Sequence, residues 1–178
     1  MCGIAIEWRS GLNPDSIKHR GIKKSELRIP AKNLKLTHFK LPFQTELDDK
    51  WDQPVPLENG NILLFNGEIF NIHPTYKNDV EYLQDFFSKP DWLRNIGGLE
   101  YNTWDGFWSI VIISEEGIYC FTDPLGQKQL YYNASGISSE MKGFKNLIIN
   151  KDFDPRKPQQ GSMTPFKDVF RIIPNLLT

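Results

Sequence analysis

Apolar and polar residues are arranged along the chain in short segments that predict β-strands. Some segments are almost wholly apolar, as in strands buried on both faces, and residues 34–43 alternate for most of their length, as in a half-buried strand. The predicted strands are residues 3–8, 34–43, 61–65, 107–113, 118–121, 130–132 and 170–173. Glu115-Glu116-Gly117 predicts the turn of a hairpin between the fourth and fifth strands. Strands therefore dominate the expected secondary structure.

Helical signals are fewer and lie between groups of strands. Asn78 stands three residues before Glu81, which is the spacing of a capping box. An apolar face with a period of 3.6 follows, made of Val80, Leu83, Phe86 and Phe87. Shorter helices are expected near residues 15–20 and 139–147. This order of elements predicts an α+β fold.

Composition narrows the class of protein. The 178 residues suit one domain, and 39% hydrophobic with 13% aromatic residues is enough for a sizeable core. The net charge of −1 gives no general attraction to nucleic acid or to an anionic membrane. No apolar run is long enough for a transmembrane helix or a signal peptide, so we expect a cytoplasmic protein. The three histidines lack metal-ligand spacing, and neither a metal nor another cofactor is predicted.

The second residue carries the most informative chemistry. Cys2 becomes the N-terminal residue if an aminopeptidase removes Met1, and it then holds a thiol and a free α-amine together. An α-amine has a pKa of about 8, so it can accept the thiol proton and later return it to a leaving amine. Cys120, the other cysteine, lies in an apolar strand and is expected to be buried and inert. Cys2 is therefore the candidate nucleophile.

Acyl chemistry on a thiol also needs donors for the oxyanion. Asn66 and Gly67 follow the buried strand 61–65 and can offer a side-chain NH2 and a backbone N–H. The same dipeptide also favours a tight turn, and from these residues alone a purely structural role is the commoner explanation.

Seven motifs occur in an order that resembles a known family. They are Met1-Cys2-Gly3-Ile4, His19-Arg20-Gly21, Gln53-Pro54, Asn66-Gly67-Glu68-Ile69-Phe70-Asn71, Asp79-Val80-Glu81, Asp123-Pro124-Leu125-Gly126-Gln127-Lys128-Gln129-Leu130-Tyr131-Tyr132 and Ser139-Glu140-Met141-Lys142. Together they resemble the class II glutamine amidotransferase domain of asparagine synthetase and its relatives, over residues 1 to about 175. The resemblance implies the N-terminal nucleophile hydrolase fold, with two antiparallel sheets between helix layers in a four-layer αββα sandwich.

The resemblance also implies an activity and a set of roles. The activity is hydrolysis of L-glutamine to glutamate and ammonia through a thioester on Cys2, without a cofactor. Asn66 and Gly67 correspond to the oxyanion donors and Glu68 lies beside the substrate. Asp79 corresponds to the carboxylate that binds the substrate ammonium, although it also suits the N-terminus of the helix that it begins. The remaining substrate-binding positions of the resemblance are Lys40, Leu41 and Phe43.

Three positions depart from the family pattern. Lys40 stands where the family usually has an arginine that grips the substrate carboxylate, and a lysine lacks the planar two-donor fork. Ile22-Lys23 replaces the usual Pro-Asp after His19-Arg20-Gly21, and Thr122 replaces an arginine. An amidohydrolase of another amide or γ-glutamyl substrate, or a degenerate module that only binds, are therefore alternatives to a glutaminase.

The chain contains no Ser-Gly-Gly-x-Asp-Ser pyrophosphate loop of the synthetase half of these enzymes. We therefore expect residues 1–178 to form a single glutaminase domain, with no synthetase domain in this chain. The expected partner is a separately encoded synthetase that consumes the ammonia.

Overall fold

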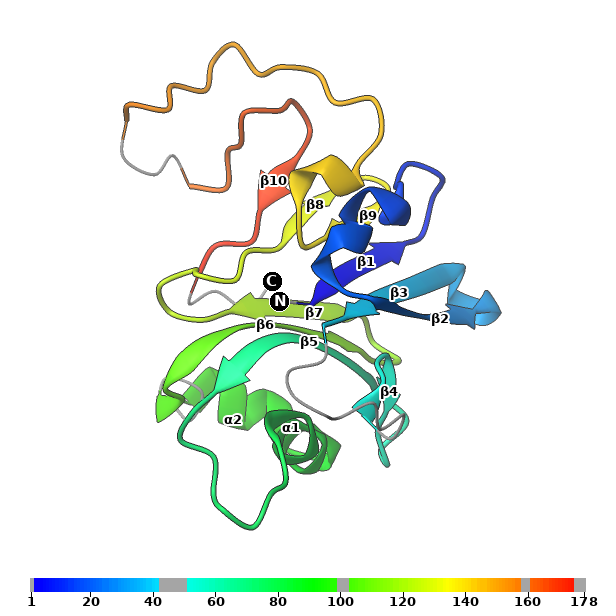
Figure 1. Cartoon of the computed structure of the whole chain (residues 1–178), viewed down its shortest axis with the longest axis vertical. Helices are drawn as coiled ribbons and strands as arrows, with labels where there is room; N and C mark the ends of the chain where they lie inside the picture. The colour runs from blue at the N-terminus through cyan, green and yellow to red at the C-terminus, as the bar shows by residue number, and fades with distance from the viewer. Residues whose placement is uncertain (1, 42–50, 99–102, 158–160, 175–178) are drawn as a thin grey trace.

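The structure is a computed structural model that describes residues 2–41, 51–98, 103–157 and 161–174. Two sheets, in which all the strand pairs are antiparallel, stack face to face (Figure 1). The six-stranded sheet has the order β10 (Phe170–Arg171), β8 (Tyr131–Asn133), β9 (Gly136–Ser138), β1 (Gly3–Glu7), β3 (Leu34–Lys40) and β2 (Lys23–Ile29). The four-stranded sheet has the order β4 (Val55–Pro56), β5 (Ile62–Ile69), β6 (Gly106–Ile113) and β7 (Ile118–Thr122). The predicted α+β class with two antiparallel sheets is confirmed.

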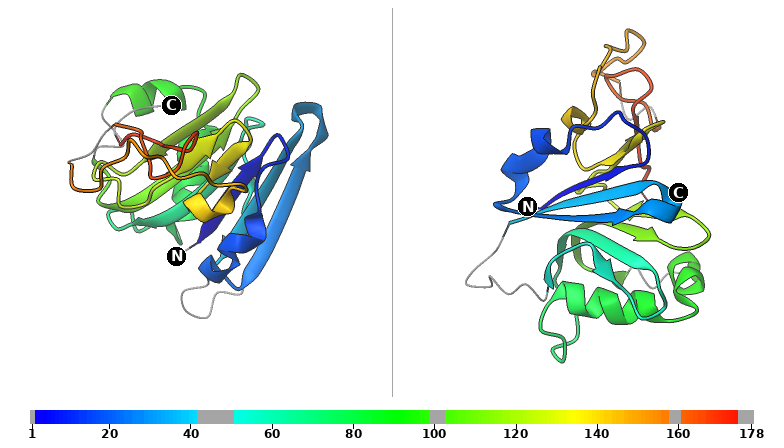
Figure 2. Two further views of the ribbon diagram at one scale, coloured as in Figure 1. Left: turned by 90° about the horizontal axis from the view of Figure 1, so that it is seen from above. Right: turned by 90° about the vertical axis from the view of Figure 1, so that its right-hand side faces the viewer.

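The two outer layers differ. Helices α1 (Asp79–Ser88) and α2 (Trp92–Gly98) cover the outer face of the four-stranded sheet (Figure 2). The outer face of the other sheet packs against 3-10 turns, η1 (Pro14–Arg20) and η5 (Met141–Gly143), and the segments that follow η5. In the described part of the chain, no helix is long and apolar enough to cross a membrane.

Three hydrophobic clusters hold these layers together. One joins the four-stranded sheet to α1 and α2, and it contains the predicted helix residues Val80, Leu83, Phe86 and Phe87. The second lies between the sheets and includes Leu64. The third packs beneath the 3-10 turns. Because alternate residues of a strand point to opposite faces, β1 and β5 direct one set of side chains into the space between the sheets.

Several predicted elements need correction. The helix expected at residues 139–147 is only the single turn η5, because the Ser139 backbone pairs with Ile4 instead. Asn66-Gly67 is not a tight turn but the middle of β5, opposite Ser109 and Trp108 on β6. The helix expected near residues 15–20 is a 3-10 helix. The patterns did not indicate β2, β4, β9, α2 or η2 (Pro30–Lys32).

The other sequence-based elements are confirmed. All seven predicted strands form. β3 ends at Lys40, and residues 42–43 of the predicted strand lie outside the described part of the chain. The capping box at α1 forms with a variation: Asn78 Oδ1 accepts from the Glu81 N–H at 2.9 Å, while Glu81 Oε2 accepts from the Lys77 N–H at 2.6 Å.

Candidate active site

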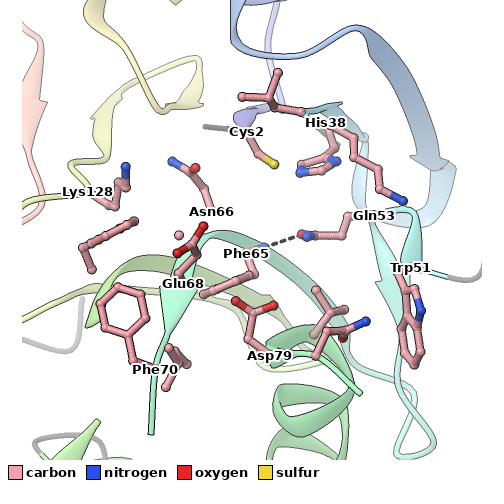
Figure 3. Close-up of a pocket in the computed structure, with 17 residues that line it drawn as sticks. Cys2, His38, Trp51, Gln53, Phe65, Asn66, Glu68, Phe70, Asp79 and Lys128 are labelled. Atoms are coloured by element: carbon pink, nitrogen blue, oxygen red, sulfur yellow. Dashed lines mark hydrogen bonds between the residues drawn. The ribbon is translucent and has the colours of Figure 1, made fainter. Parts of the chain in front are cut away.

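A cavity of about 520 Å³ lies where the ends of β1, β3, β5 and α1 meet. Cys2, Asn66, Glu68 and Asp79 all line it, and Figure 3 shows their side chains around one central space. Gly67, Lys40 and Leu41 line the same cavity. Phe43 lies outside the described residues. The fold thus brings together every other site residue that the sequence indicated.

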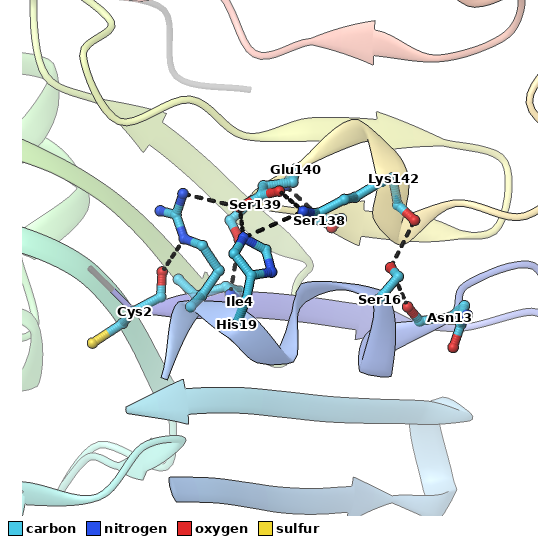
Figure 4. A network of polar contacts seen from close by, with 10 residues as sticks. Cys2, Ile4, Asn13, Ser16, His19, Ser138, Ser139, Glu140 and Lys142 are labelled. Atoms are coloured by element: carbon cyan, nitrogen blue, oxygen red, sulfur yellow. Dashed lines mark hydrogen bonds and ion pairs between the residues drawn. The ribbon is translucent and has the colours of Figure 1, made fainter. Parts of the chain in front are cut away.

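The backbone of Cys2 is held in place by a polar network (Figure 4). Arg20 Nε donates to the Cys2 carbonyl at 3.2 Å, and Arg20 Nη1 lies 3.0 Å from Glu140 Oε1. Ile4, two residues further along, donates its N–H to Ser139 Oγ at 3.1 Å, and its carbonyl accepts from the Ser139 N–H at 2.9 Å. Two of the ordered motifs, around Arg20 and around Glu140, therefore serve to position the candidate nucleophile.

The Cys2 thiol is only partly accessible, and this affects its ionisation. Burial raises the pKa of the thiol, while the backbone N–H of Leu41 acts in the opposite direction as a donor to the sulfur. The thiol therefore stays protonated at neutral pH and needs a base before it can attack a carbonyl.

Residues of β5 form the floor of the cavity. Leu64 belongs to the cluster between the sheets, so Asn66 and Glu68, two and four residues on, point toward the six-stranded sheet and Cys2. Asn66 is buried and its side-chain Oδ1 has no hydrogen-bond partner among the described residues. This oxygen is therefore available to accept a hydrogen bond from a molecule bound in the cavity that Asn66 lines.

Gly67 is fixed by close contact with the next strand. Its φ is +149°, and a Cβ at this position would lie 2.0 Å from the Phe107 carbonyl oxygen. Only glycine fits here, because any side chain would collide with the β6 backbone. The glycine signal was correct, although the turn inferred from it was not.

Asp79 is the first residue of α1, and it also lines the cavity. Burial raises its pKa to about 6, even though the backbone N–H groups of Val80 and Ile69 donate to the carboxylate and oppose the shift; Glu68 adds to it. Burial destabilises the charged form of this carboxylate, so a cation that binds beside it stabilises that form strongly. Asp79 thus begins α1 and lines the cavity, a position that is compatible with both roles that the sequence allowed for it.

Lys40 contributes to the opposite side of the cavity. Its Nζ lies 3.1 Å from Asp52 Oδ1, and the same aspartate also pairs with Lys23. Lys23 belongs to one of the segments that depart from the family pattern.

Sequence reasoning missed several residues that line the cavity. His38, Trp51, Gln53, Phe107 and Lys128 are the main ones. Lys128 Nζ lies 4.5 Å from the centre of the Phe107 ring, and burial followed by the positive Arg20 lowers its pKa. Lys128 was signalled only by its place in the Asp123–Tyr132 motif, whose Asp123 carboxylate accepts the backbone N–H of Lys128 at 2.9 Å.

The remainder of that motif has a structural role. Asp123 is fully buried and also accepts the N–H groups of Leu125 and Gln127, at 3.1 and 2.9 Å. Gly126 forms the turn with a φ of +63°.

The two stacked antiparallel sheets have the fold of the N-terminal nucleophile hydrolases, and Cys2 lies directly before the first strand, β1. The chain belongs to the glutamine amidotransferase domain family, whose model matches residues 1–171. The predicted family is therefore confirmed.

The structure is similar to that of the glutamine phosphoribosylpyrophosphate amidotransferase from B. subtilis, solved in complex with ADP and GMP. The TM-score is 0.52 at 12% sequence identity, and the match covers 79% of this chain and 42% of that one. At this identity the likeness supports the fold alone, and this chain spans less than half of that protein. A search of curated protein sequences found no match.

Proposed function

We propose that this chain hydrolyses L-glutamine to glutamate and ammonia, with Cys2 as the nucleophile after removal of Met1. The observation that carries the proposal is the shared cavity, in which the Cys2 thiol faces the Asn66-Gly67 donors and the Asp79 carboxylate. A thiol, an oxyanion site and an ammonium site are the three parts that hydrolysis of an amino-acid amide requires.

The proposed steps follow from the ionisation of these groups. The free α-amine of Cys2 accepts the thiol proton, and the sulfur attacks the side-chain amide carbon of glutamine. The Asn66 side chain and the Gly67 N–H donate to the oxyanion, and each such donor contributes about 3 kcal/mol in comparable sites. The protonated amine returns its proton to the leaving nitrogen, ammonia departs, and a thioester remains. Water then attacks the thioester and releases glutamate and the thiol.

The same arrangement gives a direction to the substrate. Asp79 binds the α-ammonium beside Glu68, and Lys40 and Leu41, with Phe43 near them in sequence, bind the rest of the amino acid. Lys40 shares its ammonium with Asp52 in the structure, which favours testing other amides of similar shape alongside glutamine.

We also propose that the ammonia is delivered to a separately encoded synthetase. The support is chemical: free ammonia is lost to solvent, whereas a glutamine amidotransferase domain exists to supply it to an acceptor. This proposal loses its support if the chain binds no synthetase in solution and if the rate of glutamine hydrolysis by the chain alone does not rise when a synthetase is added.

Covalent labelling tests the activity. Intact mass should first show the loss of Met1, and 6-diazo-5-oxo-norleucine should then add one adduct and stop ammonia release from glutamine. The Cys2→Ala variant should take up no label. The Cys120→Ala variant should be labelled like the unmodified chain, because burial raises the pKa of Cys120 to about 12 and keeps its thiol inert. Retention of Met1 without an adduct refutes the proposal, and release of ammonia from other amides but not from glutamine favours a different substrate.

A further inference from the structure

His38 is a buried polar residue that the proposed chemistry does not use. It lies on β3, opposite Ile4 of β1, and only 1% of its surface is exposed. Neither ring nitrogen has a hydrogen-bond partner among the described residues, although both are fully buried. A buried imidazole without partners costs free energy, so such a group normally serves a bound molecule or an ordered water.

The imidazole also has a defined direction. His38 and Lys40 line the cavity that contains Cys2, and Figure 3 shows the His38 ring beside Cys2. Because His38 and Lys40 are two positions apart on one strand, they share the face that points to the cavity. The two side chains therefore present a ring N–H and an ammonium to the same wall.

This pairing bears on the departure from the family pattern at position 40. A lysine offers a point charge, whereas an arginine offers two parallel donors to a carboxylate. Lys40 also has Asp52 as a neighbour at 3.1 Å, so its ammonium is shared with an anion of the protein. A second donor beside Lys40 restores two-point recognition of a carboxylate.

We infer that His38 determines substrate specificity: its ring N–H donates to the α-carboxylate of the bound amino acid, next to Lys40. The inference rests on the proposed function and names a residue that recognises the substrate of that same site. With Asp79 on the other side of the cavity as the ammonium site, the zwitterionic end of the substrate is held at two places. The side-chain amide is then left to face Cys2.

The charge state of the imidazole agrees with a donor role. Burial lowers the pKa of His38 to about 4, with Lys40 acting in the same direction and Asp52 against it. The ring is therefore neutral at pH 7 and carries one N–H donor and one acceptor nitrogen. A carboxylate can only accept, so it pairs with the N–H.

Binding measurements test this role independently of catalysis. Calorimetry in the Cys2→Ala background would compare L-glutamine with 4-aminobutanamide, which is glutamine without its carboxylate. Adding His38→Leu should weaken glutamine binding about ten- to a hundredfold, the effect of one lost hydrogen bond to a charged group, and leave 4-aminobutanamide within about twofold. His38→Asn, which keeps an N–H donor, should restore part of the affinity for glutamine.

A matched control separates recognition from folding. Thr37→Val changes the neighbouring buried residue on the opposite face of β3 and should leave both affinities unchanged. Equal losses for both ligands in His38→Leu, or no loss for glutamine, would overturn the inference. So would the absence of any glutamine binding to the folded Cys2→Ala chain. Failure of the proposed function is read separately, from the labelling of Cys2 and ammonia release by the chain with Cys2 intact.

Discussion

At the scale of single residues, the site holds groups that cost stability until a ligand arrives. Asp79 has a raised pKa and His38 has two nitrogens without partners among the described residues. Both side chains face the cavity, so the free energy that they cost the folded chain is recovered when complementary groups bind. Stability and substrate recognition are therefore opposed at these positions.

Asp79→Asn should stabilise the ligand-free chain at pH 7. The folded carboxyl keeps its proton up to about pH 6, whereas the unfolded one loses it near 3.8. Wild-type stability should therefore fall as pH rises from about 4 to about 6, and the cost at pH 7 is about 1–3 kcal/mol. The variant also loses a negative charge at the N-terminus of α1, which stabilises a helix by only about 0.3–1 kcal/mol. The net effect of the substitution at pH 7 should therefore be stabilising.

Urea unfolding at pH 4 and pH 7 checks this expectation. The variant should gain stability at pH 7 and show little difference from wild type at pH 4, where both side chains are neutral in the folded chain. Its glutamine binding should be lost at both pH values. A variant that is less stable than wild type at pH 7 contradicts the assignment of Asp79 as a strained carboxylate.

At the scale of elements, the close contact between β5 and β6 fixes Gly67, one of the two proposed oxyanion donors. Gly67→Ala should destabilise the chain by more than about 2 kcal/mol, because its Cβ meets the β6 backbone at a positive φ. Gly60→Ala is the matched control: Gly60 also has a positive φ, +83°, but a Cβ there meets nothing within 4 Å. It should cost about 1 kcal/mol. Equal losses measured by chemical unfolding would show that contact with β6 is not the cause.

The elements also show what the sequence could and could not predict. Apolar strands such as β6 were evident because burial on both faces requires unbroken hydrophobic runs. β2 escaped notice because its exposed and half-buried positions alternate among charged residues, including Lys23 and Glu26. At Ser139 the pairing with Ile4, 135 positions away, prevails over local helix propensity. Long-range pairing of this kind leaves no signal in a short window.

The candidate site also contains residues that the sequence indicated and residues that it did not. Cys2, Asn66 and Asp79 were found through motifs whose residue types match the chemistry. His38 was passed over because a lone histidine in a strand has no local partner to reveal its role. Its importance appears only when the fold places it beside Lys40 in the cavity wall.

At the scale of the whole molecule, the two sheets depend on each other for their core. Leu64→Ala removes a fully buried side chain between them and should cost about 2–5 kcal/mol. Leu125→Ala, at a position that is 80% exposed, should change stability by less than about 0.5 kcal/mol. Thermal unfolding followed by circular dichroism compares the two. A small loss for Leu64→Ala would mean that the inter-sheet contact contributes little.

The network around Cys2 also bears on the order of events in the life of the chain. β1 begins at Gly3 and is paired on one side with β3 and on the other with β9, while Arg20 holds the carbonyl of Cys2 itself. An aminopeptidase needs an extended, accessible N-terminus, whereas after folding Gly3 is paired with Phe39 of β3 and the Cys2 carbonyl accepts a hydrogen bond from Arg20. Removal of Met1 is therefore expected during synthesis, before β1 is enclosed, so that timing on the ribosome decides which chains become competent.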